Sequence, residues 1–166
     1  WPDLVVAASR PPESQGDDRP LGGGVRGILG PSPQPVLVVP GTPTGLERAV
    51  LAYDGSAKAD EALFVATYAA AEWGVEVTVV TAHERTRQGQ QILKRACRYL
   101  SERGVEVRAI ASRGGAAEAI KEIVEASDAD LVIMGGYGFG PVMKRVLGST
   151  VDRVLRESSV PVLVCR

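Results

Sequence analysis

The residues best suited to chemistry form a glycine pattern near the end of the chain, Gly135-x2-Gly138-x9-Gly148-Ser149-Thr150. Glycine lets the backbone approach a ligand closely, so that backbone amides can donate hydrogen bonds to it. If a helix begins near Thr150, its unpaired N–H groups and positive partial charge favour phosphate oxygens. The hydroxyls of Ser149 and Thr150 add donors and can cap the same helix. The pattern therefore predicts a loop that binds phosphate groups.

Apolar strands alternate with amphipathic helices from Arg48 onward, and these elements must position the loop. This alternation is typical of an α/β domain with a doubly wound, five-stranded parallel sheet. The ligand crevice of such a sheet lies at the carboxyl ends of the strands, where the winding reverses. If the first strand neighbours the fourth, the crevice joins residues 53–56 to residues 135–138. The expected strands are Arg48–Tyr53, Val75–Ala82, Val105–Ala111, Asp130–Met134 and Val160–Cys165. One expected helix ends near Trp73, and the others cover Gln88–Arg103, Ala116–Ala126 and Thr150–Arg156.

Composition narrows the class of protein. The 166 residues are 45% hydrophobic and 23% charged, which is typical of a folded globular domain. The net charge of −1 predicts no nucleic-acid or anionic-membrane partner. No apolar run reaches the roughly 18 residues that a membrane-spanning helix needs. The two cysteines lie far apart, which favours a reducing compartment, and an opening on Trp1 with no signal peptide suggests a start inside a longer protein.

The first 40 residues repeat the end of the chain. Residues 21–39 align with residues 147–165 at nine identities in nineteen positions, and Asp3-Leu-Val-Val matches Asp130-Leu-Val-Ile. We therefore expect residues 1–40 to be the C-terminal remnant of a first domain, residues 41–47 a linker and residues 48–166 a complete second domain. The alternative is that residues 1–47 are only a tail.

The first copy differs from the second at the glycine pattern. Ala8 and Pro11 stand where the second copy has Gly135 and Gly138. Proline removes an amide donor, and the side chains crowd the approach of a ligand. Any site in the first copy should therefore be a poorer one.

The glycine pattern, preceded by Asp130-Leu-Val-Ile-Met and followed by Pro161-Val-Leu-Val, resembles the ATP-binding branch of the universal stress protein family. The segment Val50-Leu-Ala-Tyr-Asp-Gly-Ser is similar to the first strand and turn of that family. The likeness covers residues 48–166, and residues 1–40 resemble the tail of a second copy. It implies the strand order 3-2-1-4-5, a nucleotide between the first and fourth strands, and a cytoplasmic protein.

The resemblance also implies which residues contact the nucleotide. Those implied for adenine and ribose are Ala52, Tyr53, Asp54, Ala82, Met134 and Gly135, and those implied for the phosphates are Gly138, Gly148, Ser149 and Thr150. Lys144 and Arg145 either reach a terminal phosphate or are plain surface. Asp54 can cap the following helix as well as contact the ribose, and the role of the Tyr53 side chain stays open.

The function that the resemblance implies is that of an ATP-binding stress-response protein, a nucleotide-dependent sensor or regulator. The ligand would be ATP, or ADP or AMP, with Mg²⁺ only as a companion of the phosphates. One alternative is a slow ATPase, for which Asp54, His83, Lys144 and Arg145 are the available contributors, although no residue is assigned as catalytic and no metal cluster is visible. The other alternative is an interaction module that binds no ligand.

Assembly is expected to involve the last strand, residues 160–165. In the implied order this strand is an edge, and an exposed apolar edge is usually paired or covered. Family members pair this edge across a dimer axis. We expect residues 35–39 to pair with it in an antiparallel manner within the chain, mimicking that dimer, or else two chains to pair through it.

Overall fold

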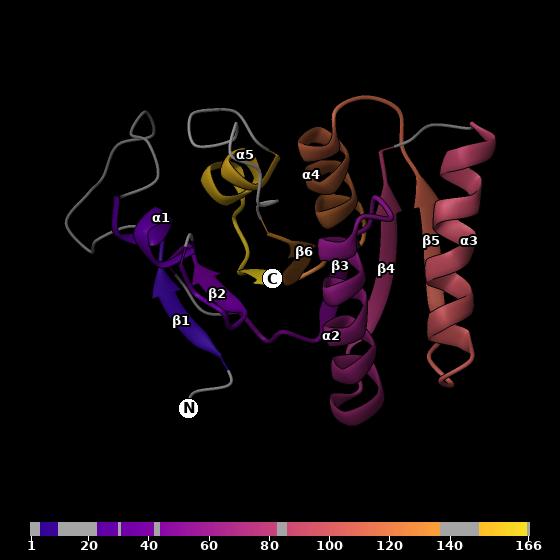
Figure 1. Ribbon diagram of the computed structural model, residues 1–166, viewed down its shortest axis with the longest axis horizontal. Helices are drawn as coiled ribbons and strands as arrows, with labels where there is room; N and C mark the ends of the chain where they lie inside the picture. The colour runs from indigo at the N-terminus through magenta and orange to yellow at the C-terminus, as the bar shows by residue number, and fades with distance from the viewer. Residues whose placement is uncertain are drawn as a thin grey trace.

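The computed structural model describes residues 4–9, 23–29, 31–41, 44–82, 86–136 and 150–165. Helices flank a single sheet (Figure 1). No helix in these ranges is long and apolar enough to cross a bilayer. The elements in chain order are β1 (Val5–Ala8), α1 (Gly23–Leu29), β2 (Val36–Val39), β3 (Arg48–Ala52), α2 (Ala57–Trp73), β4 (Glu76–Thr81), α3 (Arg87–Ser101), β5 (Val107–Ala111), α4 (Ala116–Ala126), β6 (Leu131–Gly135), α5 (Thr150–Glu157) and β7 (Val162–Cys165).

The sheet is mixed and has seven strands, in the order β1-β2-β7-β6-β3-β4-β5. Neighbouring strands are parallel except β2 and β7, which pair antiparallel, with Val36 opposite Val164 and Val38 opposite Val162. The predicted antiparallel pairing within the chain is therefore confirmed. The prediction of a five-stranded, wholly parallel sheet is corrected, because β1 and β2 join the same sheet through β7.

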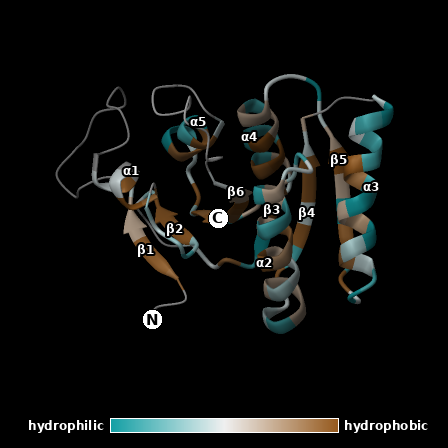
Figure 2. Cartoon of the chain, in the orientation of Figure 1, coloured by the Kyte–Doolittle hydropathy of each residue, from teal (hydrophilic) through white to brown (hydrophobic). Residues whose placement is uncertain are grey.

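Both faces of the central strands are covered, which explains the unbroken apolar runs of these strands. Side chains alternate along a strand, so Val50 and Val132 face α4 and α5 while Leu51 and Ile133 face α2 and α3. Figure 2 shows the hydrophobic colouring concentrated on the strands, with hydrophilic residues on the outer sides of the helices.

The helix α2 begins and ends at residues with capping geometry. Ser56 is its N-cap, whose side chain accepts a hydrogen bond from the Ala59 amide at 3.2 Å. Gly74 ends it in the left-handed conformation, with φ 71°, as the sequence predicts. Its buried face consists mostly of small residues, which lets the helix lie close to the sheet. The alanines of that face are Ala59, Ala62, Ala66 and Ala69.

The starts of β3 and β6 are fastened together by Asp130. Its carboxylate accepts hydrogen bonds from the amides of Glu47 (2.9 Å) and Arg48 (2.8 Å). Its carbonyl accepts a bond from the Thr44 hydroxyl at 2.7 Å. These bonds fix the register in which Ala52 lies opposite Met134 at the far ends of the two strands.

Candidate functional site

The carboxyl ends of β3 and β6 meet at one edge of the sheet. Ala52 lies opposite Met134, so Tyr53 and Gly135 follow side by side at that edge. The helix after β3, α2, covers one face, and the helix after β6, α5, covers the other. In open α/β sheets this change of side is where ligands bind. The fold thus brings together two of the segments that the sequence predicts for the site.

Gly135 is required by packing at this edge. A Cβ atom on it would lie 2.6 Å from the carbonyl carbon of Lys58 and 2.8 Å from the Ala59 nitrogen. Both are backbone atoms in the first turn of α2, which cannot move aside as a flexible side chain would. Gly135 therefore lies against the backbone of α2, a neighbour that the spacing of the glycines did not reveal.

Asp54 does not cap α2, contrary to one of the expectations. Its Oδ1 atom accepts a hydrogen bond from the Ser56 amide at 2.9 Å, and Ser56 itself is the cap. Gly55 between them has φ 78°, a conformation that favours glycine. The turn holds the exposed Asp54 carboxylate in one orientation beside the carboxyl end of β3.

The side chain of Tyr53 is a structural element of this edge. It is only 1% exposed, and its hydroxyl donates a 2.6 Å hydrogen bond to Asp60 Oδ1. Arg95 Nη2 contacts the other carboxylate oxygen of Asp60 at 2.6 Å. Burial is the larger cause, and the hydrogen bond to Asp60 the next, of a Tyr53 pKa that lies above its usual value. The phenol therefore stays protonated and can donate. Its amide also extends the ladder, donating to the Val80 carbonyl at 2.9 Å.

We expect Tyr53→Phe to lower the free energy of unfolding by about 1–2 kcal/mol, because a buried hydrogen bond to a carboxylate is lost. Urea unfolding of the two proteins measures the difference. Tyr68→Phe is the matched control, since Tyr68 is 58% exposed and should change stability by less than about 0.5 kcal/mol. An equal loss in both variants would contradict this role for the Tyr53 hydroxyl.

The remaining predicted site residues divide into two groups. Ala82 follows β4 at the same edge of the sheet, and Thr150 is the exposed first residue of α5. The others lie outside the described residues: Gly138, Gly148, Ser149, His83, Lys144 and Arg145. Sequence reasoning missed the packing of Gly135 against the backbone of Lys58, a residue whose amine contacts Glu61 at 3.1 Å. The sequence signal that could have indicated this contact is the position of Lys58 two residues after Ser56, in the first turn of α2.

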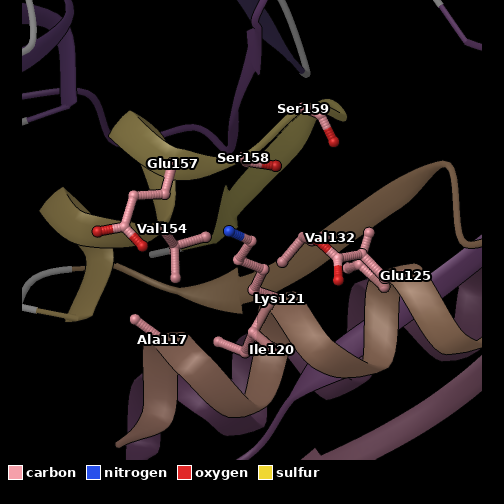
Figure 3. Close-up of a pocket in the computed structure, with 10 residues that line it drawn as sticks. Ala117, Ile120, Lys121, Glu125, Val132, Val154, Glu157, Ser158 and Ser159 are labelled. Atoms are coloured by element: carbon pink, nitrogen blue, oxygen red, sulfur yellow. The ribbon is translucent and has the colours of Figure 1, made fainter. Parts of the chain in front are cut away.

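A separate hollow lies between α4 and α5 over Val132 of β6 (Figure 3). Ile120, Val132 and Val154 give it an apolar floor, and Lys121 extends from α4 toward α5 across it. Of the predicted nucleotide contacts that the structure describes, none lines this hollow. It is thus distinct from the edge formed by β3 and β6.

Comparison with known proteins identifies the family. The model of the universal stress protein family matches residues 83–166. A universal stress protein of Thermus aquaticus is 35% identical over 132 residues, which cover 70% of this chain and 96% of the relative. Another, of Synechocystis, is 29% identical over 166 residues, 99% of this chain and 58% of the relative.

Solved structures of this family have the same fold. A universal stress protein from Archaeoglobus fulgidus superposes with a TM-score of 0.79 at 27% identity, over 99% of this chain and 60% of that one. A universal stress protein solved in complex with cAMP gives a TM-score of 0.63 at 24% identity, over 74% of this chain and 99% of that one. The chain thus spans about 60% of the length of the first relatives it matches. On the family match and the Thermus relative together, the chain belongs to the universal stress protein family.

Proposed function

We propose that this chain binds an adenine nucleotide, with ATP as the favoured ligand, and acts as a nucleotide-dependent sensor or regulator. The observation that carries the proposal is the meeting of β3 and β6 at one edge, with α2 and α5 on opposite faces. The predicted phosphate loop runs from Gly135, at this edge, to Thr150, the first residue of α5. A ligand lying over the edge would therefore reach both strands and the positive end of a helix.

Adenine and ribose contacts are proposed for the residues at the strand ends. Asp54 is the best placed for a ribose hydroxyl, because the Ser56 amide orients its exposed carboxylate. Backbone groups and apolar contacts to adenine and ribose would come from Ala52, Ala82 and Met134. Tyr53 would contribute only its backbone, since its hydroxyl is bound to Asp60. The phosphates would be held by Gly138, Gly148, Ser149 and Thr150, with Mg²⁺ as their companion.

The cAMP complex of a relative supports an adenine nucleotide as the ligand class. A sensor role requires in addition that the nucleotide binds two conformations with different affinity. For the whole protein we propose the organisation that the repeat predicts, with residues 1–40 from a first copy, a linker at 41–47 and a nucleotide-binding copy at 48–166. The antiparallel pairing of β2 and β7 would then reproduce a family dimer within one chain.

Calorimetric titration of the chain with ATP, ADP, AMP and cAMP in the presence of Mg²⁺ tests the ligand. We expect ATP to bind with a Kd around micromolar, about −8 kcal/mol. Adenosine is the matched control, and its weaker binding would show that the phosphates contribute. A folded chain that binds none of these would be a ligand-free interaction module, contrary to the proposal.

A further inference from the structure

We propose that the outer faces of α2 and α3 form a binding surface for a single-stranded nucleic acid. The bases would stack on exposed rings carried mainly by α2, and the phosphates would lie along basic side chains of α3. Both helices cover the same face of the sheet (Figure 1). The inference is independent of the nucleotide site proposed above.

Aromatic side chains gather on this surface. Among the five aromatic residues that the structure describes, only Tyr53 is buried. Phe64, Tyr68 and Trp73 of α2 are 51%, 58% and 73% exposed. The ring centroids of Tyr68 and Trp73 are 5.6 Å apart. The ring of Phe64 lies 5.2 Å from that of Tyr99 on α3, which completes a row of four rings that we call the ring row. Exposed apolar groups gathered in one place mark an interaction surface.

Basic side chains gather next to the ring row. The helix α3 carries four of them and no carboxylate. Residues 86–113, which contain α3 and β5, hold seven basic residues and two acidic ones, whereas the whole chain holds 19 and 20. The net charge of −1, from which no nucleic-acid partner is expected, averages over this segregation. The local charge therefore favours a polyanion at this end of the sheet.

Three of these cations form a second row on the outer side of α3. Helical periodicity places Arg87, Lys94 and Arg98 opposite the buried Ala96, and all three are exposed. Lys94 and Arg98 are four residues apart, so they lie one helical turn, about 6 Å, from each other. Like charges at this spacing destabilise a helix. A bound anion would remove that cost, so the basic row suits a ligand with repeated negative charges.

The cations of the basic row are available to such a ligand. Among the described residues, no carboxylate pairs with Arg87 or Lys94. The contact of Arg98 with Glu102 is long, at 3.8 Å, and the two side chains are 76% and 61% exposed. An exposed ion pair of this kind is weak. Phosphate groups can therefore displace Glu102 from Arg98 at little cost.

Two contacts between α2 and α3 hold the ring row and the basic row side by side. Arg95 on α3 contacts Asp60 on α2 at 2.6 Å, and Phe64 meets the ring of Tyr99. The guanidinium of Arg103 lies 3.5 Å from the centre of the Tyr99 ring, so the surface already holds one stack of a planar group on a ring. Rings of this kind beside a basic track are the two components of a surface that binds single strands.

An anionic membrane would also attract rings and cations, but the arrangement favours a strand. The rings and the cations lie in separate rows on two helices, as the bases and the phosphates of a strand do, whereas a bilayer surface has no such division. Glu72, beside Trp73, is exposed at the end of the ring row, where anionic headgroups would repel it. Six of the seven cations of residues 86–113 are arginines, which pair with phosphate through two parallel N–H bonds.

The first test measures the contribution of the rings. A fluorescein-labelled oligouridine of about 20 nucleotides is titrated with the full chain in about 50 mM KCl, and binding is followed by anisotropy. We expect a Kd of about 10 μM. The double substitution Phe64→Leu and Tyr68→Leu should raise the Kd about tenfold, because leucine keeps an apolar surface but cannot stack on a base. Urea unfolding should show that the variant is as stable as the unaltered chain to within about 1 kcal/mol.

The second test measures the contribution of the basic row. Lys94→Gln with Arg98→Gln should raise the Kd and reduce the slope of log K against log salt by about 1.4, as expected for two lost phosphate contacts. Lys121→Gln with Arg156→Gln is the matched control. It removes the same charge from exposed residues of α4 and α5, on the opposite face of the sheet, and should change neither quantity.

Trp73 distinguishes a strand from a membrane. With Trp1→Phe it becomes the only tryptophan of the chain. We expect oligouridine to quench its fluorescence by stacking, and vesicles of phosphatidylcholine with phosphatidylglycerol to leave its emission unshifted. A blue shift with vesicles and no binding of oligouridine would identify a membrane as the partner and overturn the proposal.

Three further results would also overturn it. They are a chain that does not bind oligouridine, equal weakening by the two charge variants, and displacement of oligouridine by excess ATP, which would place the strand in the nucleotide site. A chain that binds oligouridine but gives no heat with ATP would contradict the proposed function and leave this inference intact.

Discussion

Replacing Gly135 with alanine is expected to lower the free energy of unfolding by about 3 kcal/mol, because the new methyl group collides with backbone rather than side chain. The obstructing atoms, 2.6–2.8 Å from the ideal Cβ position, belong to Lys58 and Ala59 in the first turn of α2. Relief requires that α2 move away from β6, which opens the core at Leu131 and Ile133. Urea unfolding measures the effect as a lower midpoint with an unchanged m-value.

Gly27→Ala is the matched control for this prediction. Nothing lies within 4 Å of a Cβ atom placed on Gly27, which is an exposed residue of α1. Alanine there should be neutral or stabilise the helix by up to about 1 kcal/mol. If Gly135→Ala proved as harmless as Gly27→Ala, the contact between β6 and α2 would be looser than described, and the need for glycine would have to come from a ligand.

The sequence predicted the elements of residues 48–165 because their apolar periodicity is local. The helix Ala116–Ala126 has the predicted bounds, and α2 ends at the predicted glycine. The largest errors, of two residues each, fall at the starts of β5 and β7 and at the end of α3. Val105 was assigned to a strand, but its amide donates to the Leu100 carbonyl at 3.1 Å and completes the end of α3. Such capping depends on hydrogen bonds that hydrophobic pattern does not encode.

The number of strands in the sheet differs more from the prediction than the bounds of the elements do, because the sheet has seven strands and not five. The sequence predicts five parallel strands within residues 48–166 and, separately, an antiparallel partner for the last of them in residues 35–39. A single antiparallel contact between β2 and β7 makes one sheet of seven strands. An apolar edge strand indicates that another strand will pair with it, which sequence can show, whereas the extent of the resulting sheet depends on both segments that meet there.

The candidate site was predictable in its location but not in its contacts. Glycine and aspartate at strand ends indicate a crevice, since parallel strands end at one edge. That Gly135 meets α2, or that the Tyr53 hydroxyl meets Asp60 and through it Arg95, depends on helices placed by tertiary packing. Residue type gave the possibility of each contact, and only the fold selects the partner.

Replacing Gly138 with valine is expected to weaken ATP binding about a hundredfold, from a micromolar Kd to about 100 μM, or about 2.7 kcal/mol. Gly138 lies outside the described residues, so the expectation comes from its place three residues after Gly135 in the predicted phosphate loop. A β-branched side chain restricts the backbone and blocks the approach of phosphate oxygens to its amides. Calorimetric titration with ATP and Mg²⁺ measures the change.

Two comparisons make the result of Gly138→Val specific. Gly27→Val, the same substitution on the exposed helix α1, should leave the Kd for ATP unchanged. Urea unfolding of Gly138→Val should stay close to that of the unaltered chain, which distinguishes a lost ligand contact from a lost fold. If the valine variant is folded and binds ATP as tightly as the unaltered chain, the glycine loop does not hold the phosphates, and the nucleotide would be bound through the ends of β3, β4 and β6 alone.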